Sequence, residues 1–280
     1  MSLPGYIESP SRINETIGDI SRWLLVAGVI NLINMPLSGL LFFYMMPMMA
    51  TTSFYPRFLI FIGLGIIGLF FELIAVIKLR GLRDITDEEL FSIGTIFVII
   101  GVIISITGFI ILFLVMLPVL IVFTPSLHAY VLGNSAVYRF EFAFIFLVIM
   151  GIPGIIALIG RIILAVAFWR FGEMNHSDFM IVAGIIYIFL SAIGMILLGT
   201  ILYGFRNRGR RFLSNESLLN IIKDRLARSP PNTSVDLKAL AKQYNVPVFL
   251  LVSVVRYWII MGEVEGIVSD SLFIAQRAGP

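Results

Sequence analysis

The sequence has no cysteine, few histidines and little charge. Its 280 residues include two His and no Cys, and 13% of them are charged. Without Cys there can be no disulfide, thiolate metal ligand or thiol nucleophile, and two His are too few for most imidazole metal sites. Soluble globular domains carry about 25% charged residues. The composition therefore excludes an ordinary soluble enzyme and predicts no cofactor, no metal and no catalytic site.

Long apolar runs are what the chain has instead. Hydrophobic residues make up 59% of the sequence, and the mean hydropathy is +1.01. A run longer than about 18 apolar residues is typical of a transmembrane helix. The sequence predicts five such helices, over residues 23–50, 58–79, 91–123, 142–168 and 179–205, after a polar N-terminal tail over 1–22. A break at Gly151–Gly154, around Pro153, would make a sixth span, so the expected fold is an all-α polytopic membrane protein with five or six spans.

Small residues recur at regular spacing in two parts of this region. Residues 58–123 and 142–205 are interpreted as an internal repeat with parallel pseudo-symmetry. The matches are Ala75-Val76 with Ala165-Val166, Arg80 with Arg170, Ser105 with Ser191, and Gly108 with Gly194. Heptad spacing also relates Gly94, Gly101 and Gly108, and Gly184 and Ser191. Such stripes let helices approach closely, either within one chain or in a homo-oligomer.

A few polar residues interrupt the apolar spans. Asn31, Asn34 and Pro36 lie in the first span, where they either face neighbouring helices or line a cavity. Glu72 and Arg161 lie eight and nine residues before the matching Arg80 and Arg170. That spacing places the two side chains at similar depth, so they are candidates for an intramembrane ion pair. The alternative is that Arg161 reaches the interface and Glu72 is protonated.

Residues 206–280 have the composition of a membrane boundary followed by a small soluble domain. The boundary is a cluster of Arg206, Arg208, Arg210 and Arg211. Helical patterns follow over 217–228, 235–243 and 247–261, the last ended by Gly262. Two short strands are predicted over 263–268 and 272–275. Three helices and a hairpin are the order of a winged helix, an α+β fold.

The residues of this domain carry a resemblance to known families. The stretch from Val235 to Val268, with Leu240-Ala241, Gly262 and Gly266, resembles PCI-type winged helices and the related domain of the membrane-anchored DDRGK family. That resemblance implies protein–protein contacts, although Ser269-Asp-Ser271 replaces the Asp-Asp-Arg-Gly-Lys turn. Phe168-Trp-Arg-Phe-Gly-Glu173 resembles a signature of an uncharacterised archaeal family of multi-span membrane proteins, which implies no known activity.

The third helix of the domain is poorly suited to reading DNA. Its only charged residue is Arg256, and the hairpin adds Glu263, Glu265 and Asp270, which would repel phosphate. Protein contact is therefore favoured over nucleic acid. The expected partner-binding surface is formed by Phe249, Arg256, Tyr257 and Trp258.

The arginine cluster and the soluble domain favour a cytoplasmic C-terminal domain in a cell-membrane protein. Five spans would then leave the N-terminus outside, and six would bring it inside. The function predicted first is a non-enzymatic scaffold or adaptor that presents the winged helix to a protein partner. The alternatives are a membrane-tethered DNA-binding regulator, and a transporter or translocation subunit in which Glu72, Arg161, Asn31 and Asn34 line a path.

Overall fold

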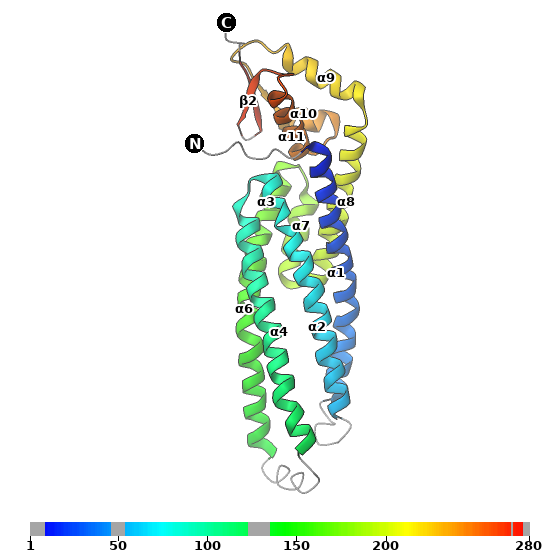
Figure 1. The fold of residues 1–280 in the computed structure, drawn as a ribbon, viewed down its shortest axis with the longest axis vertical. Helices are drawn as coiled ribbons and strands as arrows, with labels where there is room; N and C mark the ends of the chain where they lie inside the picture. The colour runs from blue at the N-terminus through cyan, green and yellow to red at the C-terminus, as the bar shows by residue number, and fades with distance from the viewer. Residues whose placement is uncertain (1–8, 46–53, 123–134, 270, 277–280) are drawn as a thin grey trace.

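The computed structural model describes residues 9–45, 54–122, 135–269 and 271–276. These form a long helical bundle with a small domain at one end (Figure 1). We call residues 214–276 the tail domain, and the end of the bundle beneath it the tail side. Most of the described chain is helical, and the only strands in this part of it lie in the tail domain.

Four helices are long and apolar enough to cross a membrane. Their apolar stretches are Pro10–Leu37, Ile62–Thr86, Glu89–Ile111 and Gly151–Met174. The helices themselves are α1 (Pro10–Met45), α2 (Phe54–Leu79), α4 (Glu89–Val122) and α6 (Ser135–Met174), with the short α3 (Gly81–Thr86) between α2 and α4. Both Pro36 and Pro153 lie inside helices that continue past them. The break at Gly151–Gly154 that would give six spans is therefore not present.

The predicted continuous fifth span over 179–205 is wrong. The chain here forms α7 (Asp178–Phe189) and α8 (Ser191–Leu213), separated by Leu190, whose φ of −126° and ψ of 69° are not helical. Residues seven apart in one helix are separated by about 10 Å along its axis. Here a Cβ at Gly194 would overlap the backbone of Tyr187. The two helices therefore fold back on each other.

This hairpin begins and ends on the tail side. α7 starts directly after the end of α6, where the Ser177 amide bonds to the Gly172 carbonyl, and α8 ends beneath the tail domain (Figure 1). Four helices of spanning length and one hairpin place the start of α1 on the tail side as well. The expectation from five spans, which put the two ends of the chain on opposite sides, is wrong for this reason. Residues 10–22 are the first turns of α1, packed beside α8 and α11.

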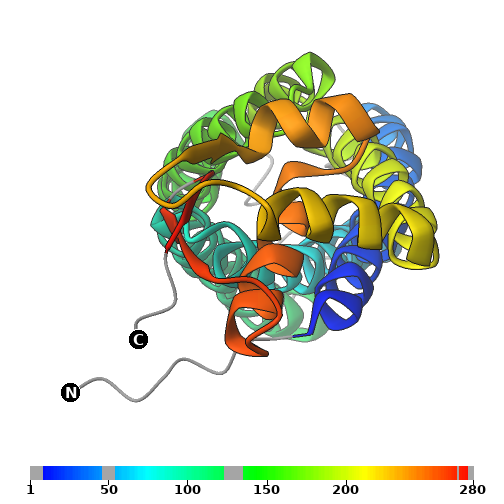
Figure 2. The ribbon, with the colours of Figure 1, turned by 90° about the horizontal axis from the view of Figure 1, so that it is seen from above.

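The helices form a ring when the bundle is seen from the tail side (Figure 2). α1 packs against α2 and α8, α4 packs against α2 and α6, and α7 lies between α6 and α8. The glycine stripe of the third span has the packing role predicted for it. Gly94 lies against the Gly160 carbonyl, and Gly101 against Ala157 and the Pro153 carbonyl of α6.

The interpreted repeat corresponds to segments that run in the same directions. α2 and α6 both run toward the tail side, and α4 and α7 both run away from it (Figure 1). The correspondence stops at Leu190, because α4 continues through the bundle whereas α7 turns back. Ser191 and Gly194, which match Ser105 and Gly108, stand at this turn.

The tail domain contains three helices and a small antiparallel sheet. The elements are α9 (Glu216–Ala227), β1 (Ser234–Asp236), α10 (Leu237–Tyr244), α11 (Val248–Ile260), β2 (Gly266–Ser269) and β3 (Leu272–Ala275). The strand order is β1-β3-β2, with Val235 opposite Phe273 and Ile267 opposite Ile274. The three helices and the hairpin are confirmed, and β1 was not predicted. Asn245 and Gly262 end their helices at φ values of 53° and 70°, as expected for left-handed terminators.

Candidate functional site

An open cavity of about 420 Å³, with exposed apolar side chains at its edge, lies at the turn of the α7–α8 hairpin. Its polar lining comes from four different helices and consists of Asn31, Asn34, Glu72, Ser105 and Ser191. Its apolar lining includes Met35, Leu64, Leu69, Phe109, Phe189, Leu190 and Ile193. We call this space the mid-depth cavity.

The polar residues of the cavity lie near the middle of the apolar part of the bundle. A helix rises about 1.5 Å per residue, so Asn31, nine residues after Arg22, lies roughly 13 Å below it. Glu72 lies eight residues before Arg80, which corresponds to roughly 12 Å. Half the hydrocarbon thickness of a typical bilayer is about 15 Å. A bilayer whose boundary lies at Arg22 and Arg80 would place the cavity at the depth where polar groups are most costly to bury.

Glu72 and Arg161 form an ion pair next to this cavity. The Arg161 Nη2 atom donates to the Glu72 Oε1 atom over 2.5 Å, joining α2 to α6. Glu72 is 4% exposed, whereas the Arg161 side chain is 22% exposed, so the carboxylate is the buried member of the pair. The Arg161 guanidinium also lies 5.9 Å from the centre of the Tyr187 ring on α7. The structure therefore brings together the two ionisable residues that the sequence placed at similar depth.

The polar residues of the first span both face α2 and line the cavity. Asn34 Nδ2 donates to the Leu64 carbonyl at 3.3 Å. The Asn31 carboxamide lies against Gly68, where an added Cβ would come within 2.6 Å of Asn31 Oδ1. Because Gly68 has no side chain, both carboxamides can pack directly against α2 at this position. Pro36 is exposed inside α1 and does not line the cavity.

Three buried polar atoms around the cavity have no hydrogen-bond partner among the described residues. They are Asn31 Nδ2, Arg161 Nε and Tyr187 Oη. A buried polar group left unpaired costs about 1–3 kcal/mol. Such groups are rare in native structures and mark places where another hydrogen-bonding group is missing. Asn31 Nδ2 is the one of these atoms whose residue lines the cavity, so it is available to a polar ligand or water there.

An aromatic layer closes the bundle between this cavity and the tail domain. Phe171 on α6 lies 6.3 Å from Phe91, 6.0 Å from Phe205 and 5.7 Å from Phe249, measured between ring centroids. Phe168 stacks edge-on against Phe91 at 5.2 Å. All five rings are at most 3% exposed. Phe249 belongs to α11, so the tail domain supplies part of the seal.

Polar contacts hold the tail domain over the aromatic layer. The Val248 amide donates to Asn175 Oδ1 at 3.0 Å, and Arg256 pairs with Asp87 at 3.1 Å. Arg208 donates to Asn245 Oδ1 at 3.3 Å and lies over the Phe205 ring. Partial burial there lowers the pKa of the Arg208 guanidinium.

The surface predicted to bind a partner is largely used within the chain. Phe249 and Trp258 are buried, and Arg256 is paired with the α3–α4 turn. Tyr257 remains exposed on α11. The apolar character of this helix on all sides is therefore explained by two cores, one inside the tail domain and one against the bundle.

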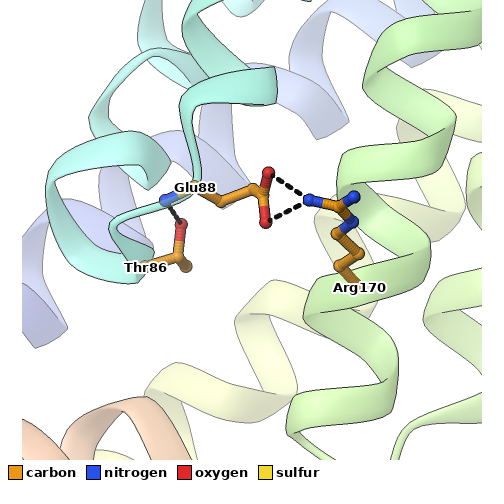
Figure 3. A network of polar contacts seen from close by, with 3 residues as sticks. All are labelled: Thr86, Glu88 and Arg170. Carbon is orange, nitrogen blue, oxygen red and sulfur yellow. Dashed lines mark hydrogen bonds and ion pairs between the residues drawn. The ribbon is translucent and has the colours of Figure 1, made fainter. Parts of the chain in front are cut away.

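The rim of the bundle is tied together by charged residues. Arg170 Nη1 donates to both carboxylate oxygens of Glu88, at 3.0 and 3.2 Å (Figure 3). Thr86 Oγ1 accepts from the Glu88 amide and so fixes the turn before α4 (Figure 3). Arg170 belongs to the Phe168–Glu173 segment whose resemblance was noted above. That segment supplies two rings of the aromatic layer, Phe168 and Phe171, together with the arginine that pairs with Glu88 and a hydrogen bond from Trp169 to Glu173.

The boundary arginines lie within α8 rather than after it. Arg206 lies against Gly18 of α1, and Arg208 contacts the tail domain. Arg210 and Arg211 are exposed in the last turns of the helix. α8 thus carries the chain without interruption from the mid-depth cavity to the base of the tail domain.

Sequence reasoning missed three members of the site. Ser105 and Ser191 were interpreted only as repeat and packing positions, and Tyr187 was not singled out. The signal for Ser191 was its place beside Gly194 in an otherwise apolar run. No group of His, Cys, Asp and Glu suited to a metal ion occurs in the described part of the chain.

Comparison with known proteins gives no match: no family model, no curated protein and no solved structure is similar to this chain. The resemblances to PCI-type and DDRGK domains and to an archaeal membrane family therefore stay predictions. The mid-depth cavity and its ion pair are the features from which a function can be argued.

Proposed function

We propose that the protein is a multi-pass membrane transport protein that carries a small molecule through the mid-depth cavity. The observation that carries this proposal is the cavity itself, with Asn31, Asn34 and Glu72 gathered at the turn of a helical hairpin. Discontinuous helices that meet near the bilayer midplane are a recurrent way to build a substrate site. Ionisable residues at this depth mark pathways more often than they support a fold.

The aromatic layer supports a closed state toward the tail side. Phe249 completes that layer, so release of α11 would remove one of its rings. We further propose that the tail domain is a winged helix on the cytoplasmic face. Its order of helix, strand, two helices and hairpin, with β3 between β1 and β2, supports this assignment. The four arginines of α8 support the orientation.

A single cysteine can test whether the cavity is a water-accessible path, because the chain has no Cys of its own. We expect Ser105→Cys to react with a charged, membrane-impermeant methanethiosulfonate reagent in proteoliposomes. The matched control is Ile103→Cys, two residues away on the exposed apolar face of α4. That thiol should stay unmodified, since lipid does not support the thiolate that reacts.

The direction of access tests the transport cycle. With the tail domain docked, Ser105→Cys should react only from the face opposite the tail side. Adding Phe249→Ala should make it react from the tail side too. If Ser105→Cys and Ile103→Cys are equally unreactive from both faces, the cavity is no path and the proposal is wrong.

An adaptor function is the second candidate. Its support is a set of exposed apolar side chains on the tail domain, namely Tyr257, Ile260, Met261, Ile267 and Leu272. Crosslinking in native membranes should then capture one protein through these positions in the full-length chain, and replacing them with Ser should abolish its capture. A DNA-binding regulator is less well supported, because α11 is packed against the bundle and not open to a groove.

A further inference from the structure

We infer that the mid-depth cavity binds an amphipathic amine, whose ammonium group takes the place of Arg161 at the Glu72 carboxylate. This inference rests on the proposed function, since it names the class of molecule that the cavity carries. It follows from the charge of the cavity wall, from the surroundings of Arg161 and from the apolar remainder of the lining.

The cavity wall carries one charge, and it is negative. Glu72 is the only ionisable residue among those that line the described cavity. Arg161 reaches the same carboxylate from α6 and does not itself line the cavity. A ligand cation therefore meets Glu72 directly, whereas a ligand anion would meet a carboxylate in a setting of low dielectric. Of the two members of the ion pair, the carboxylate is the one that faces the cavity, and it attracts a cation.

The Arg161 guanidinium has a second interaction partner, the Tyr187 ring, when a ligand occupies Glu72. The guanidinium lies 5.9 Å from the centre of the Tyr187 ring, within the range of a cation–π interaction. The Tyr187 hydroxyl and the Arg161 Nε atom have no partner among the described residues. After displacement from Glu72, the guanidinium would keep its contact with the uncharged Tyr187 ring, which offsets part of the lost attraction but does not cancel the charge.

The rest of the cavity suits an apolar body. Phe109 and Phe189 provide aromatic surface, and Leu64, Leu69 and Ile193 provide aliphatic surface. Such a lining contributes affinity through buried apolar area, while the few polar groups fix the orientation of the ligand. An amine with an aromatic or alkyl body satisfies both parts of the lining.

The test measures binding by protection of Ser105→Cys from N-ethylmaleimide in the purified full-length protein. Three probes share one body and differ in charge: 2-phenylethylammonium, 2-phenylethanol and 3-phenylpropionate. We expect the ammonium to protect at concentrations at least roughly tenfold lower than the alcohol. The carboxylate should not protect. Equal protection by the ammonium and the alcohol would overturn the inference.

Variants of Glu72 and Arg161 test directly whether the charge of the ion pair determines which probe binds. Glu72→Gln should weaken ammonium protection by at least roughly tenfold and let the carboxylate protect, because Arg161 is then unpaired. Arg161→Met should strengthen ammonium protection, because no internal cation competes. The double variant Glu72→Gln/Arg161→Met is neutral and should treat the ammonium and the alcohol alike. Glu88→Gln, from the ion pair at the rim, is the matched control, and in it the ammonium should protect Ser105→Cys as well as it does without this change.

The double variant also keeps the test decisive if a single variant fails to fold, since it leaves no charge unpaired. If it still prefers the ammonium, the inference is wrong. The two proposals fail differently. A thiol that reacts and is protected equally by all three probes overturns the amine but leaves a ligand-binding cavity. A thiol that no probe protects overturns the amine and counts against transport as well.

The ammonium could belong to a free amine or to the head group of an aminophospholipid. Nanodiscs of phosphatidylethanolamine and of phosphatidylglycerol separate these sources. Protection in phosphatidylethanolamine alone, without added amine, would assign the site to the lipid. Protection that needs added 2-phenylethylammonium in both would assign it to the free amine.

Discussion

Two layers of the same bundle, about two helical turns apart, are built in opposite ways. Arg161 and Phe168 both lie on α6, seven residues or roughly 10 Å apart. Around Phe168 the rings of four helices meet and are fully buried. Around Arg161 the polar atoms outnumber their partners, and a cavity lies alongside. Of the two layers, only the one around Arg161 offers the polar groups that the proposed ligand would need.

Removing the acidic member of the polar layer should have the largest effect on stability. Glu72→Gln leaves Arg161 without its counter-charge, and breaking a buried ion pair costs about 3–5 kcal/mol. The loss would appear as a lower unfolding midpoint in detergent. Arg161→Met should have a similar effect, and the double change should recover part of it. Losses that simply add would show that the two residues act independently.

Disrupting the aromatic layer should lower the stability by a comparable amount, but the loss should be located in α11. Phe249→Ala removes a ring that contacts Phe171 and Phe205, and such truncations cost about 3–5 kcal/mol. Hydrogen exchange should become faster in α11 than in α4 or α6. The control is Tyr257→Ala in the same helix, whose side chain is exposed and whose loss should be small. Uniform protection of α11 in both variants would contradict a seal made by the tail domain.

A substitution in the α7–α8 hairpin should have a moderate effect on thermal stability. Gly194→Ala forces a Cβ into the Tyr187 backbone, and overpacking of this kind costs about 1–3 kcal/mol. Gly204→Ala on the same helix meets nothing within 4 Å and should stabilise the helix by up to about 1 kcal/mol. Opposite signs in thermal unfolding are expected. Two stabilising changes would mean that α7 and α8 do not fold back on each other.

The smallest effect on stability should come from breaking an ion pair at the rim of the bundle. Asp87→Asn removes the partner of Arg256, but the Asp87 side chain is 72% exposed. Exposed pairs contribute about 0.2–1 kcal/mol. The difference between Asp87→Asn and the unaltered chain should shrink further as salt is raised, because exposed charges are screened. A loss that persists at high salt would show that this contact is buried when the tail domain is docked.

The sequence carried enough information for the local elements and for one long-range pair. Runs of apolar residues located four spans, and Asn245 and Gly262 located the ends of two tail helices. Glu72 and Arg161 could be paired from sequence because helix rise converts residue number into depth. Each of these inferences needs only the geometry of a single helix.

The turn at Leu190 could not be predicted in the same way. The run from Phe179 to Phe205 is apolar throughout and has neither Pro nor Gly at the turn. What allows the hairpin is the absence of a side chain at Gly194, opposite the Tyr187 backbone, and this is a tertiary contact. The docking of α11 on the bundle could not be predicted from the sequence for a related reason. Its apolar residues were visible, but the rings of α6 and α8 that cover them lie far away in the sequence.

The hairpin of α7 and α8 also has a consequence for how the protein is made. Because it returns to the face where it entered, residues 214–276 lie on the side from which α7 begins, and with the cytoplasmic orientation proposed above they need no translocation across the bilayer. Insertion of the bundle can therefore be complete while the tail domain is still being synthesised. Phe249 belongs to α11, so the aromatic layer can close only after α11 has been synthesised and has docked on the bundle.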